Sequence, residues 1–274
     1  MRIVVKVGTS TLAHPTGRQN IQRMERLCKV LSDLKNAGHE VILVSSGAIA
    51  MGVGKLNLPG RPADMPTKQA AAAIGQCELM YFYDKLFTEY NHTVAQLLIT
   101  APDIAEGGVR KENFHNTLER LLDLGALPVI NENDTISTDE IVIGDNDTLS
   151  AIVATLVGAD ALILMSDIDG LYTDDPRQNP NAEFIEQVDE LTEEFMHMGK
   201  ASTGSNVGTG GMNTKMIAAK IATSSDVDMI IANSKDIGVL HRLLSGENEG
   251  TLFVAHKDEI FDLPEFVQNL HKNQ

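Results

Sequence analysis

Six short and almost wholly apolar runs recur along the 274-residue chain. They are Ile3–Val5, Val41–Val44, Val94–Ile99, Leu127–Ile130, Ala161–Met165 and Met229–Ala232, and Gln96 interrupts the third with a polar side chain. Apolar runs of this length without polar alternation are typical of strands that are buried on both faces of a parallel sheet. The pattern therefore predicts strands at these six places.

Segments with the apolar spacing of helices lie between these runs. Asn20 is suited to begin a helix from about residue 21 to residue 36, and Gly38 is suited to end it. Further helices are predicted near residues 68–90, 114–124, 148–157, 212–224 and 237–244. The alternation of strand and helix predicts an α/β fold with an open, mainly parallel sheet in an αβα sandwich. We expect residues 1–274 to form a single domain, because no linker or internal repeat divides the chain.

Composition narrows the possible partners of the protein. The chain has 22 Lys and Arg against 38 Asp and Glu, a formal net charge of −16, which argues against a nucleic-acid or anionic membrane partner. Cys28 fits the apolar face of a predicted helix, and neither it nor Cys77 belongs to a metal-binding cluster. No signal peptide or membrane-spanning run is evident, so we expect a cytoplasmic protein.

Ligands of such folds bind at the carboxyl ends of the strands, so the residues that follow the predicted strands are candidates for function. Lys6 and Gly8 follow the first strand and are suited to phosphate oxygens, although an ordinary turn explains them equally well. Ser46 and Gly47 follow the second strand and open a possible helix. Its free N–H groups can bind an anion, and a plain helix cap is the alternative.

Two polar clusters come after the fourth strand. They are Asn131–Asp134 and Gly144–Asp147, and they exceed what a turn requires. Their amides and carboxylates are suited to the α-ammonium and α-carboxylate of an amino acid, and Asp147 could also position lysines. The stretch 136–140 between the clusters is a candidate hairpin or lid.

Two further loops are candidates for a nucleotide site. Ser166–Arg177 follows the fifth strand, with an acidic surface loop as the alternative. Gly208–Lys215 is rich in glycine and precedes a predicted helix, so its N–H groups are open to phosphates, although a flexible linker explains it as well. It is not a Walker A motif, which requires Gly-Lys-Ser or Gly-Lys-Thr.

Taken together and in order, these segments resemble the amino-acid kinase family, and within it the members that phosphorylate glutamate. The matching segments are Lys6–Ser10, Ser46–Ala50, Val129–Asp134, Gly144–Asp147, Gly170–Arg177, Gly208–Met212 and Thr214–Lys215. Each segment is weak evidence alone, but the ordered set spans nearly the whole chain and is specific.

The resemblance implies an activity. ATP, with Mg²⁺ carried by the nucleotide, would phosphorylate the γ-carboxylate of L-glutamate to L-glutamyl 5-phosphate, the first step toward proline. It further implies proline as a feedback inhibitor and a homo-oligomer, either a dimer or a tetramer. Many relatives carry an additional C-terminal domain for which this chain has no room, so we expect a short form.

The resemblance also assigns residues. Lys6 and Lys215 match lysines that contact the transferred phosphoryl group, and Asp147 matches an aspartate that organises them. Glutamate-binding positions are implied at Ser46, Gly47, Asn131, Asp134, Asp145 and Asn146. ATP-binding positions are implied at Lys6, Gly8, Ser166, Asp167, Thr209, Gly210, Gly211, Met212, Asn213, Thr214 and Lys215. No protein ligand for a metal is assigned. Ser166 departs from the threonine of many relatives but keeps the hydroxyl group.

Two other readings remain open. The chain could be another kinase of the family, acting on N-acetylglutamate, aspartate, carbamate or UMP. It could also be a nucleotide or amino-acid sensor that keeps the fold without catalysis, although retention of both lysines argues against this.

Overall fold

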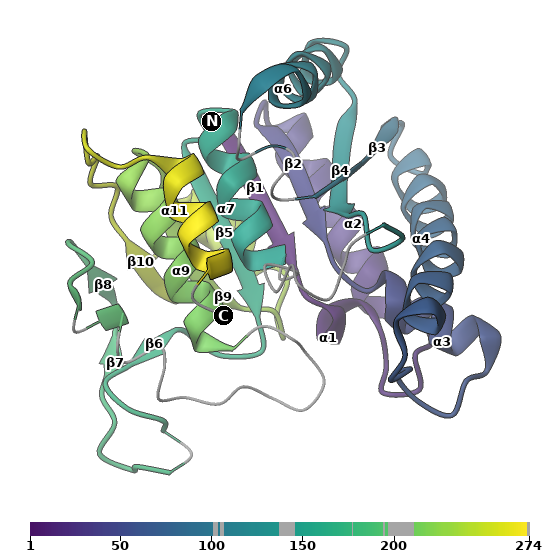
Figure 1. Ribbon diagram of the computed structural model, residues 1–274, viewed down its shortest axis with the longest axis horizontal. Coiled ribbons are helices and arrows are strands. Elements are labelled where there is room, and N and C mark those ends of the chain that lie inside the picture. The colour runs from purple at the N-terminus through teal and green to yellow at the C-terminus, as the bar shows by residue number, and fades with distance from the viewer. Residues whose placement is uncertain are drawn as a thin grey trace.

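A computed structural model describes residues 1–100, 104, 107–136, 146–176, 178–193, 195–196 and 211–272. Its centre is an eight-stranded sheet in the order β3-β4-β2-β1-β5-β9-β10-β8 (Figure 1). The strands are β1 (Arg2–Val7), β2 (Glu40–Ser45), β3 (Val94–Ile99), β4 (Leu127–Glu132), β5 (Ala161–Ser166), β8 (Gln187–Val188), β9 (Asp228–Asn233) and β10 (Thr251–Phe253). All neighbours in this sheet pair in parallel except β9 and β10.

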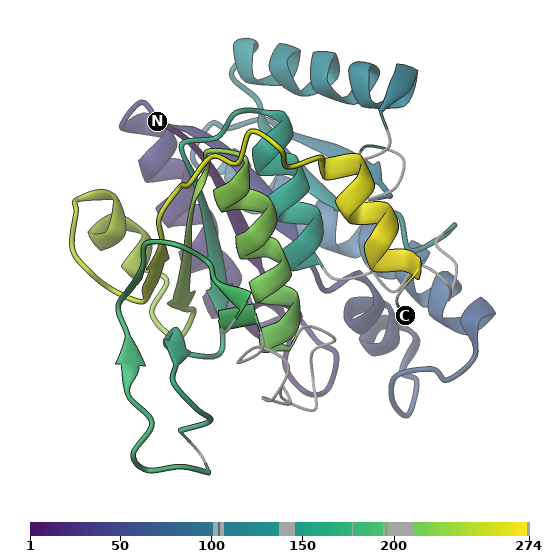
Figure 2. The ribbon, with the colours of Figure 1, turned by 60° about the vertical axis from the view of Figure 1, so that its left-hand side comes forward.

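Helices cover both faces of the sheet (Figures 1 and 2). They are α1 (Thr9–Leu12), α2 (Ile21–Asn36), α3 (Ala48–Leu56), α4 (Met65–Thr88), α6 (Gly108–Asp123), α7 (Asn146–Leu156), α9 (Met212–Ser224), α10 (Val239–Leu244) and α11 (Leu263–Lys272). Residues of α2, α4 and α10 form one hydrophobic core against the sheet, and residues of α6, α7, α9 and α11 form the other. The αβα sandwich predicted from the sequence is therefore confirmed.

The side chains of the central strand β1 alternate between the two faces of the sheet. Ile3, Val5 and Val7 belong to the core on the side of α2 and α4, whereas Val4 belongs to the core on the side of α7 and α9. Because alternate residues of a strand point to the same face, Lys6 shares the face of Val4. The strand thereby aims this lysine at the layer that contains α7 and α9.

Local signals account for two of the helix starts. The side chain of Asn20 accepts a hydrogen bond from the N–H of Arg23 at the start of α2. The side chain of Asp64 does the same for the N–H of Thr67 at the start of α4. The second cap and the helix-compatible proline that follows it explain why α4 begins at Met65 rather than at the predicted residue 68.

The helices α3 and α4 pack with their backbones in contact. A Cβ atom on Gly75 would lie 1.7 Å from the carbonyl oxygen of Ala48, and one on Gly52 would lie 1.9 Å from that of Ala71. Neither glycine can therefore carry a side chain without moving a helix. This contact fixes α4 relative to the amino end of α3.

Several boundaries differ from the prediction. The strands extend further than the apolar runs, so Lys6 lies within β1, and both Asn131 and Ser166 lie within strands instead of after them. The backbone groups of these polar residues still pair within the sheet, and a pattern of apolar side chains does not reveal this pairing. The helix α6 begins at Gly108, six residues before the predicted start. The short elements α1, β8, β10 and α11 and the two-stranded sheet of β6 (Leu171–Tyr172) with β7 (Phe184–Ile185) were not predicted.

Candidate active site

Two lysines and one aspartate meet at the carboxyl end of the central strand. The Nζ atom of Lys6 lies 2.6 Å from Oδ1 of Asp147, and the Nζ atom of Lys215 lies 3.0 Å from Oδ2 of the same carboxylate. The side chains of Lys6, Lys215 and Asp147 are 9%, 7% and 1% exposed. Residues more than 200 positions apart in the chain thus form one buried ion cluster with a net charge of +1.

The neighbours of Asp147 keep this carboxylate ionised. Burial alone would raise its pKa, but Coulombic attraction to Lys6 and Lys215, together with their hydrogen bonds, holds the pKa well below the usual range. The hydroxyl of Thr214 also donates to Oδ2 at 3.2 Å. Asp147 is therefore an anion that keeps two ammonium groups side by side.

Three elements bring this cluster together. Lys6 comes from β1, Asp147 from the first turn of α7 and Lys215 from the first turn of α9. The helices α7 and α9 pack side by side on the face of the sheet toward which Lys6 points. A Cβ atom on Gly8 would lie 3.8 Å from Nζ of Lys6, so this glycine keeps the space beside the ammonium group open.

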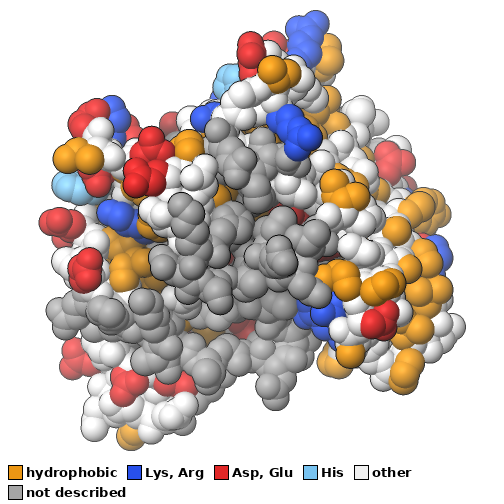
Figure 3. Space-filling view, viewed as in Figure 1, with side chains coloured by type: hydrophobic (Ala, Val, Ile, Leu, Met, Phe, Trp, Pro, Cys, Tyr) orange, Lys and Arg blue, Asp and Glu red, His pale blue; other side chains and the backbone are white. Residues whose placement is uncertain are grey.

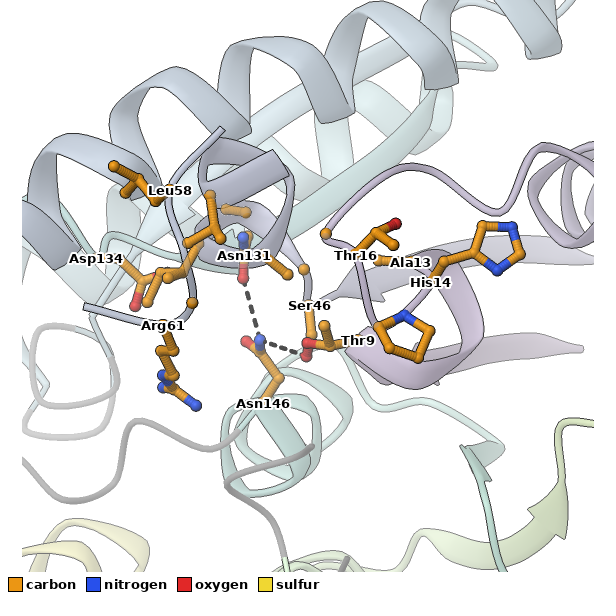
Figure 4. Close-up of a pocket in the computed structure, with 18 of the residues that line it drawn as sticks. Thr9, Ala13, His14, Thr16, Ser46, Leu58, Arg61, Asn131, Asp134 and Asn146 are labelled. Carbon is orange, nitrogen blue, oxygen red and sulfur yellow. Dashed lines mark hydrogen bonds between the residues drawn. The ribbon is translucent and has the colours of Figure 1, made fainter. Parts of the chain in front are cut away.

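A cavity of about 440 Å³ lies beside the carboxyl ends of β2 and β4 (Figure 4). Its polar lining comes from the end of β4, from the segments after β2 and β4, from the first turn of α7, from α1 and the loop after it, and from the loop after α3. The lining residues are Thr9, Ala13, His14, Pro15, Thr16, Gly17, Ser46, Gly47, Ala48, Ile49, Ala50, Val53, Leu58, Pro59, Gly60, Arg61, Asn131, Glu132, Asp134 and Asn146. Its volume suits a small metabolite.

Hydrogen bonds order the polar wall of this cavity. The amide nitrogen of Asn146 donates to Oγ of Ser46 at 2.8 Å and to Oδ1 of Asn131 at 3.1 Å (Figure 4). Gly47 adopts φ of +103° where the chain turns into α3, a conformation that favours glycine. Five of the six glutamate-binding positions implied by the resemblance therefore line one cavity, and the sixth, Asp145, lies outside the described residues.

Asp134 and Arg61 face the same cavity from different segments (Figure 4). Burial raises the pKa of Asp134 to about 6, and the nearby Arg61 guanidinium opposes part of that rise. Arg61 is the only Lys or Arg among the described lining residues. The cavity therefore offers a carboxylate and a guanidinium to a ligand that carries both signs of charge.

The other half of the sheet carries the positions implied for a nucleotide. Ser166 ends β5, is 8% exposed, and its hydroxyl lies 3.4 Å from Oδ1 of Asp167. Gly211, Met212, Asn213 and Thr214 lead into Lys215 at the start of α9. Thr209 and Gly210 lie outside the described residues, as do the greater part of the predicted 136–140 lid and the rest of the Gly-rich segment before residue 211. Lys6 lies on β1 between these two halves of the sheet.

Sequence reasoning missed several lining residues. Arg61 lies in the Pro59–Pro62 turn after α3, and His14 and Thr16 lie in the loop after α1. Neither loop follows a strand, so the rule used to select candidates could not find them. An arginine between two prolines in a loop was the one available signal.

The described part of the chain holds no helix that is long and apolar enough to cross a membrane. Within the same residues, no group of three or more His, Cys, Asp or Glu side chains is arranged to hold a metal ion.

Comparison of the chain with known proteins identifies its family. The model of the amino acid kinase family matches residues 1–233. A glutamate 5-kinase from Clostridium perfringens is 53% identical over 262 residues, which cover 94% of this chain and 97% of that protein. One from Carboxydothermus hydrogenoformans is 54% identical over 259 residues, which cover 93% of this chain and 68% of that protein.

A solved structure supports the fold assignment. The UMP kinase of Bacillus anthracis matches with a TM-score of 0.62 and 20% identity, over 93% of this chain and 96% of that one. At this level of identity the likeness concerns the fold alone.

Proposed function

The chain belongs to the amino acid kinase family, and from that premise we propose that it is a glutamate 5-kinase, which transfers the γ-phosphoryl group of ATP to the γ-carboxylate of L-glutamate. The observation that carries this proposal is the buried Lys6–Asp147–Lys215 cluster beside a cavity that offers both a carboxylate and a guanidinium.

The proposed reaction requires no general base. A glutamate side chain has a pKa of about 4.3 and is already ionised at neutral pH. One of its oxygens forms a bond to the γ-phosphorus of ATP, the bond from that phosphorus to the β,γ-bridging oxygen breaks, and ADP leaves with the electron pair. Both reactants are anions, so the barrier is mainly electrostatic and is lowered by positioning and by charge neutralisation.

Lys6 and Lys215 are suited to that neutralisation. Their ammonium groups are held by one carboxylate, so their positions are set before the substrates arrive. Since Asp147 cancels only one of the two charges, the cluster keeps a net positive charge for the transferred phosphoryl group. Preorganised donors in a site that excludes water act more strongly than the same donors in bulk water.

The cavity supplies complementary groups for the amino-acid end of glutamate. On our proposal, Asp134 and the carbonyl oxygen of Asn146 accept from the α-ammonium. Ser46 and Arg61 donate to carboxylate oxygens, and Gly47 with the amino end of α3 adds backbone N–H groups. These opposite charges on one small cavity favour an α-amino acid over a simple dicarboxylate.

The nucleotide would lie over β5 and the start of α9. Ser166 and Asp167 are suited to its base or ribose, and the N–H groups from Gly211 onward to its phosphates. Mg²⁺ in this proposal is held mainly by the phosphate oxygens of ATP and neutralises their charge.

The test is glutamate-dependent ADP release with hydroxylamine present to trap the acyl phosphate as a hydroxamate. We expect ADP and hydroxamate to form in equal amounts and only when glutamate is added. ADP release without hydroxamate would contradict the proposal. A panel with N-acetylglutamate, aspartate, carbamate and UMP separates the other kinases of the family, and binding of ATP and glutamate without ADP release would support the sensor alternative.

We also propose that the chain works as a homo-oligomer, a dimer or a tetramer. An apolar stripe on α4 supports this, because Ala70, Ala73, Cys77 and Tyr81 face outward at helical spacing and Tyr81 is 60% exposed. Apolar side chains of the same region are visible on the α4 side of the molecule in Figure 3. The neighbouring β3 is an apolar strand at the edge of the sheet, which is a surface open to pairing.

The remaining features of the proposal concern regulation, location and extent. Proline is the proposed feedback inhibitor, since it carries the ammonium and carboxylate groups for which the cavity is suited. A biosynthetic kinase that uses ATP is proposed to act in the cytoplasm. Residues 1–274 are proposed to form one kinase domain, because β1 near the amino end and β10 near the carboxyl end belong to the same sheet.

A further inference from the structure

A row of hydrogen-bonded amide side chains leads from the cavity to the edge of the sheet. Asn131, which receives a hydrogen bond from Asn146, donates through Nδ2 to Oε1 of Gln76 on α4 at 2.9 Å. Gln76 in turn donates through Nε2 to Oε1 of Gln96 on the edge strand β3 at 3.3 Å. Asn131 is 1% exposed and Gln76 is 6% exposed, so both amides lie in the interior.

A backbone N–H group determines which way round the amide groups of this row are oriented. The N–H of Glu132 donates to Oδ1 of Asn131 at 2.9 Å, and a backbone N–H can only donate. The carbonyl end of the Asn131 amide must therefore face Glu132 and Asn146. Its NH₂ end faces α4, where Gln76 must present an oxygen.

This orientation of the amide groups determines which hydrogen-bond donors and acceptors the cavity offers to a ligand. Asn146 uses Nδ2 for both Ser46 and Asn131, which leaves its carbonyl oxygen as the remaining polar atom. That oxygen is buried and has no hydrogen-bond partner among the described residues. The Ser46 hydroxyl accepts from Asn146, so its proton is available to donate. One acceptor and one donor thus stand next to each other, as an ammonium and a carboxylate require.

Gln76 is held in place by more than its hydrogen bonds. Gly75, its neighbour in α4, packs against the carbonyl oxygen of Ala48 so closely that a Cβ atom would lie 1.7 Å from it. Ala48 begins α3 and lines the cavity. The position of the Gln76 side chain is therefore fixed relative to the cavity wall by backbone packing.

We propose that Gln76 is a positioning residue for the amino-acid substrate. It touches no substrate atom, but its oxygen holds the NH₂ end of Asn131. Asn131 in turn orients Asn146, whose carbonyl oxygen faces the α-ammonium group. The proposal rests on the proposed function, because it concerns affinity for glutamate. It adds a residue of α4 that neither the strand-end rule nor the family motifs select.

The experiment compares steady-state kinetics of Gln76→Leu and Gln76→Glu with the wild-type protein. Leucine keeps approximately the volume of glutamine but offers no acceptor to Asn131, whereas glutamate keeps an oxygen in that place. Gln22→Leu, at an exposed position on α2, is the matched control for the substitution itself.

In Gln76→Leu we expect the KM for glutamate to rise roughly tenfold, the size expected for one misdirected buried hydrogen bond. Its kcat should stay within about twofold of wild type, and its KM for ATP should not change, because the nucleotide half of the sheet is not touched. In Gln76→Glu the KM for glutamate should stay within about threefold of wild type, as it should in the control.

An unchanged glutamate KM in Gln76→Leu would overturn the proposal, as would an equal rise in Gln76→Glu or a parallel rise in the KM for ATP. If Gln76→Leu does not fold, Gln96→Leu decides, since it removes the acceptor that orients Gln76 at an exposed position. We expect a rise of about threefold there, and no rise overturns the proposal. Absence of glutamate-dependent ADP release in the wild-type protein would instead refute the proposed function.

Discussion

Replacing Asp147 with asparagine removes the carboxylate that pairs with both Lys6 and Lys215. All three side chains are less than a tenth exposed, so solvent cannot screen the two ammonium groups that remain. Breaking a buried ion pair by removing one partner typically costs about 3–5 kcal/mol, because an uncompensated charge stays in the interior. We expect Asp147→Asn to lose about that much of the free energy of unfolding.

The measurement is urea denaturation at neutral pH, with Asp167→Asn as a control because Asp167 lies on the surface at the end of a neighbouring strand. The double variant Asp147→Asn/Lys215→Met makes the test specific, since it also removes one of the two repelling charges. We expect the double variant to be more stable than Asp147→Asn alone while both lack activity. Equal stability of Asp147→Asn and wild type, or a further loss in the double variant, would refute the ion-cluster explanation.

The same substitution has a defined pH dependence. The folded pKa of Asp147 lies below its ordinary value of 3.8, so its ionisation contributes stability that is complete above that value. This contribution is lost as pH falls through the folded pKa. The stability difference between wild type and Asp147→Asn should therefore be constant near neutrality and shrink only in strong acid.

Three further predictions concern the site and its support. Lys215→Ala should lower kcat by roughly 10²–10³-fold, equivalent to about 2.7–4 kcal/mol of barrier, with an unchanged far-UV circular dichroism spectrum, and near-normal turnover would contradict its role. The glutamate KM should rise as pH falls through about 6, because protonation of Asp134 removes its charge, and Asp134→Ala should show a high KM without this pH dependence. Gly75→Ala should destabilise the protein by about 1–3 kcal/mol or more in thermal unfolding, because its Cβ atom meets the carbonyl oxygen of Ala48, and an unchanged Tm would contradict that packing.

The sequence predicts the layers of the fold because apolar runs and helical spacing are local signals. All six expected strands are present, and the helix expected at 212–224 has those bounds in the structure. The strand β10 escaped prediction because it has only three residues and pairs with distant parts of the chain.

The sequence points to site residues where polar side chains follow an apolar strand and where a glycine-rich loop precedes a helix, as at Lys215. Lys6, Asn131 and Ser166 could be selected because each follows an apolar run. The meeting of Lys6 with Lys215 depends on the face toward which β1 aims the lysine and on the packing of α7 against α9, which no local pattern contains. Arg61 and Gln76 were missed because one lies in a loop after a helix and the other inside a helix.

The central claim is that a carboxylate oxygen of glutamate attacks the γ-phosphorus of ATP. Glutamate labelled with ¹⁸O in its γ-carboxylate tests it directly, because cyclisation of the acyl phosphate by attack of the α-amine on the acyl carbon breaks the carbon–oxygen bond and leaves the labelled bridging oxygen on phosphate. We predict inorganic phosphate that carries one ¹⁸O atom from glutamate. Phosphate without the label, formed at the same rate as ADP, would mean that water is the nucleophile and would contradict the claim.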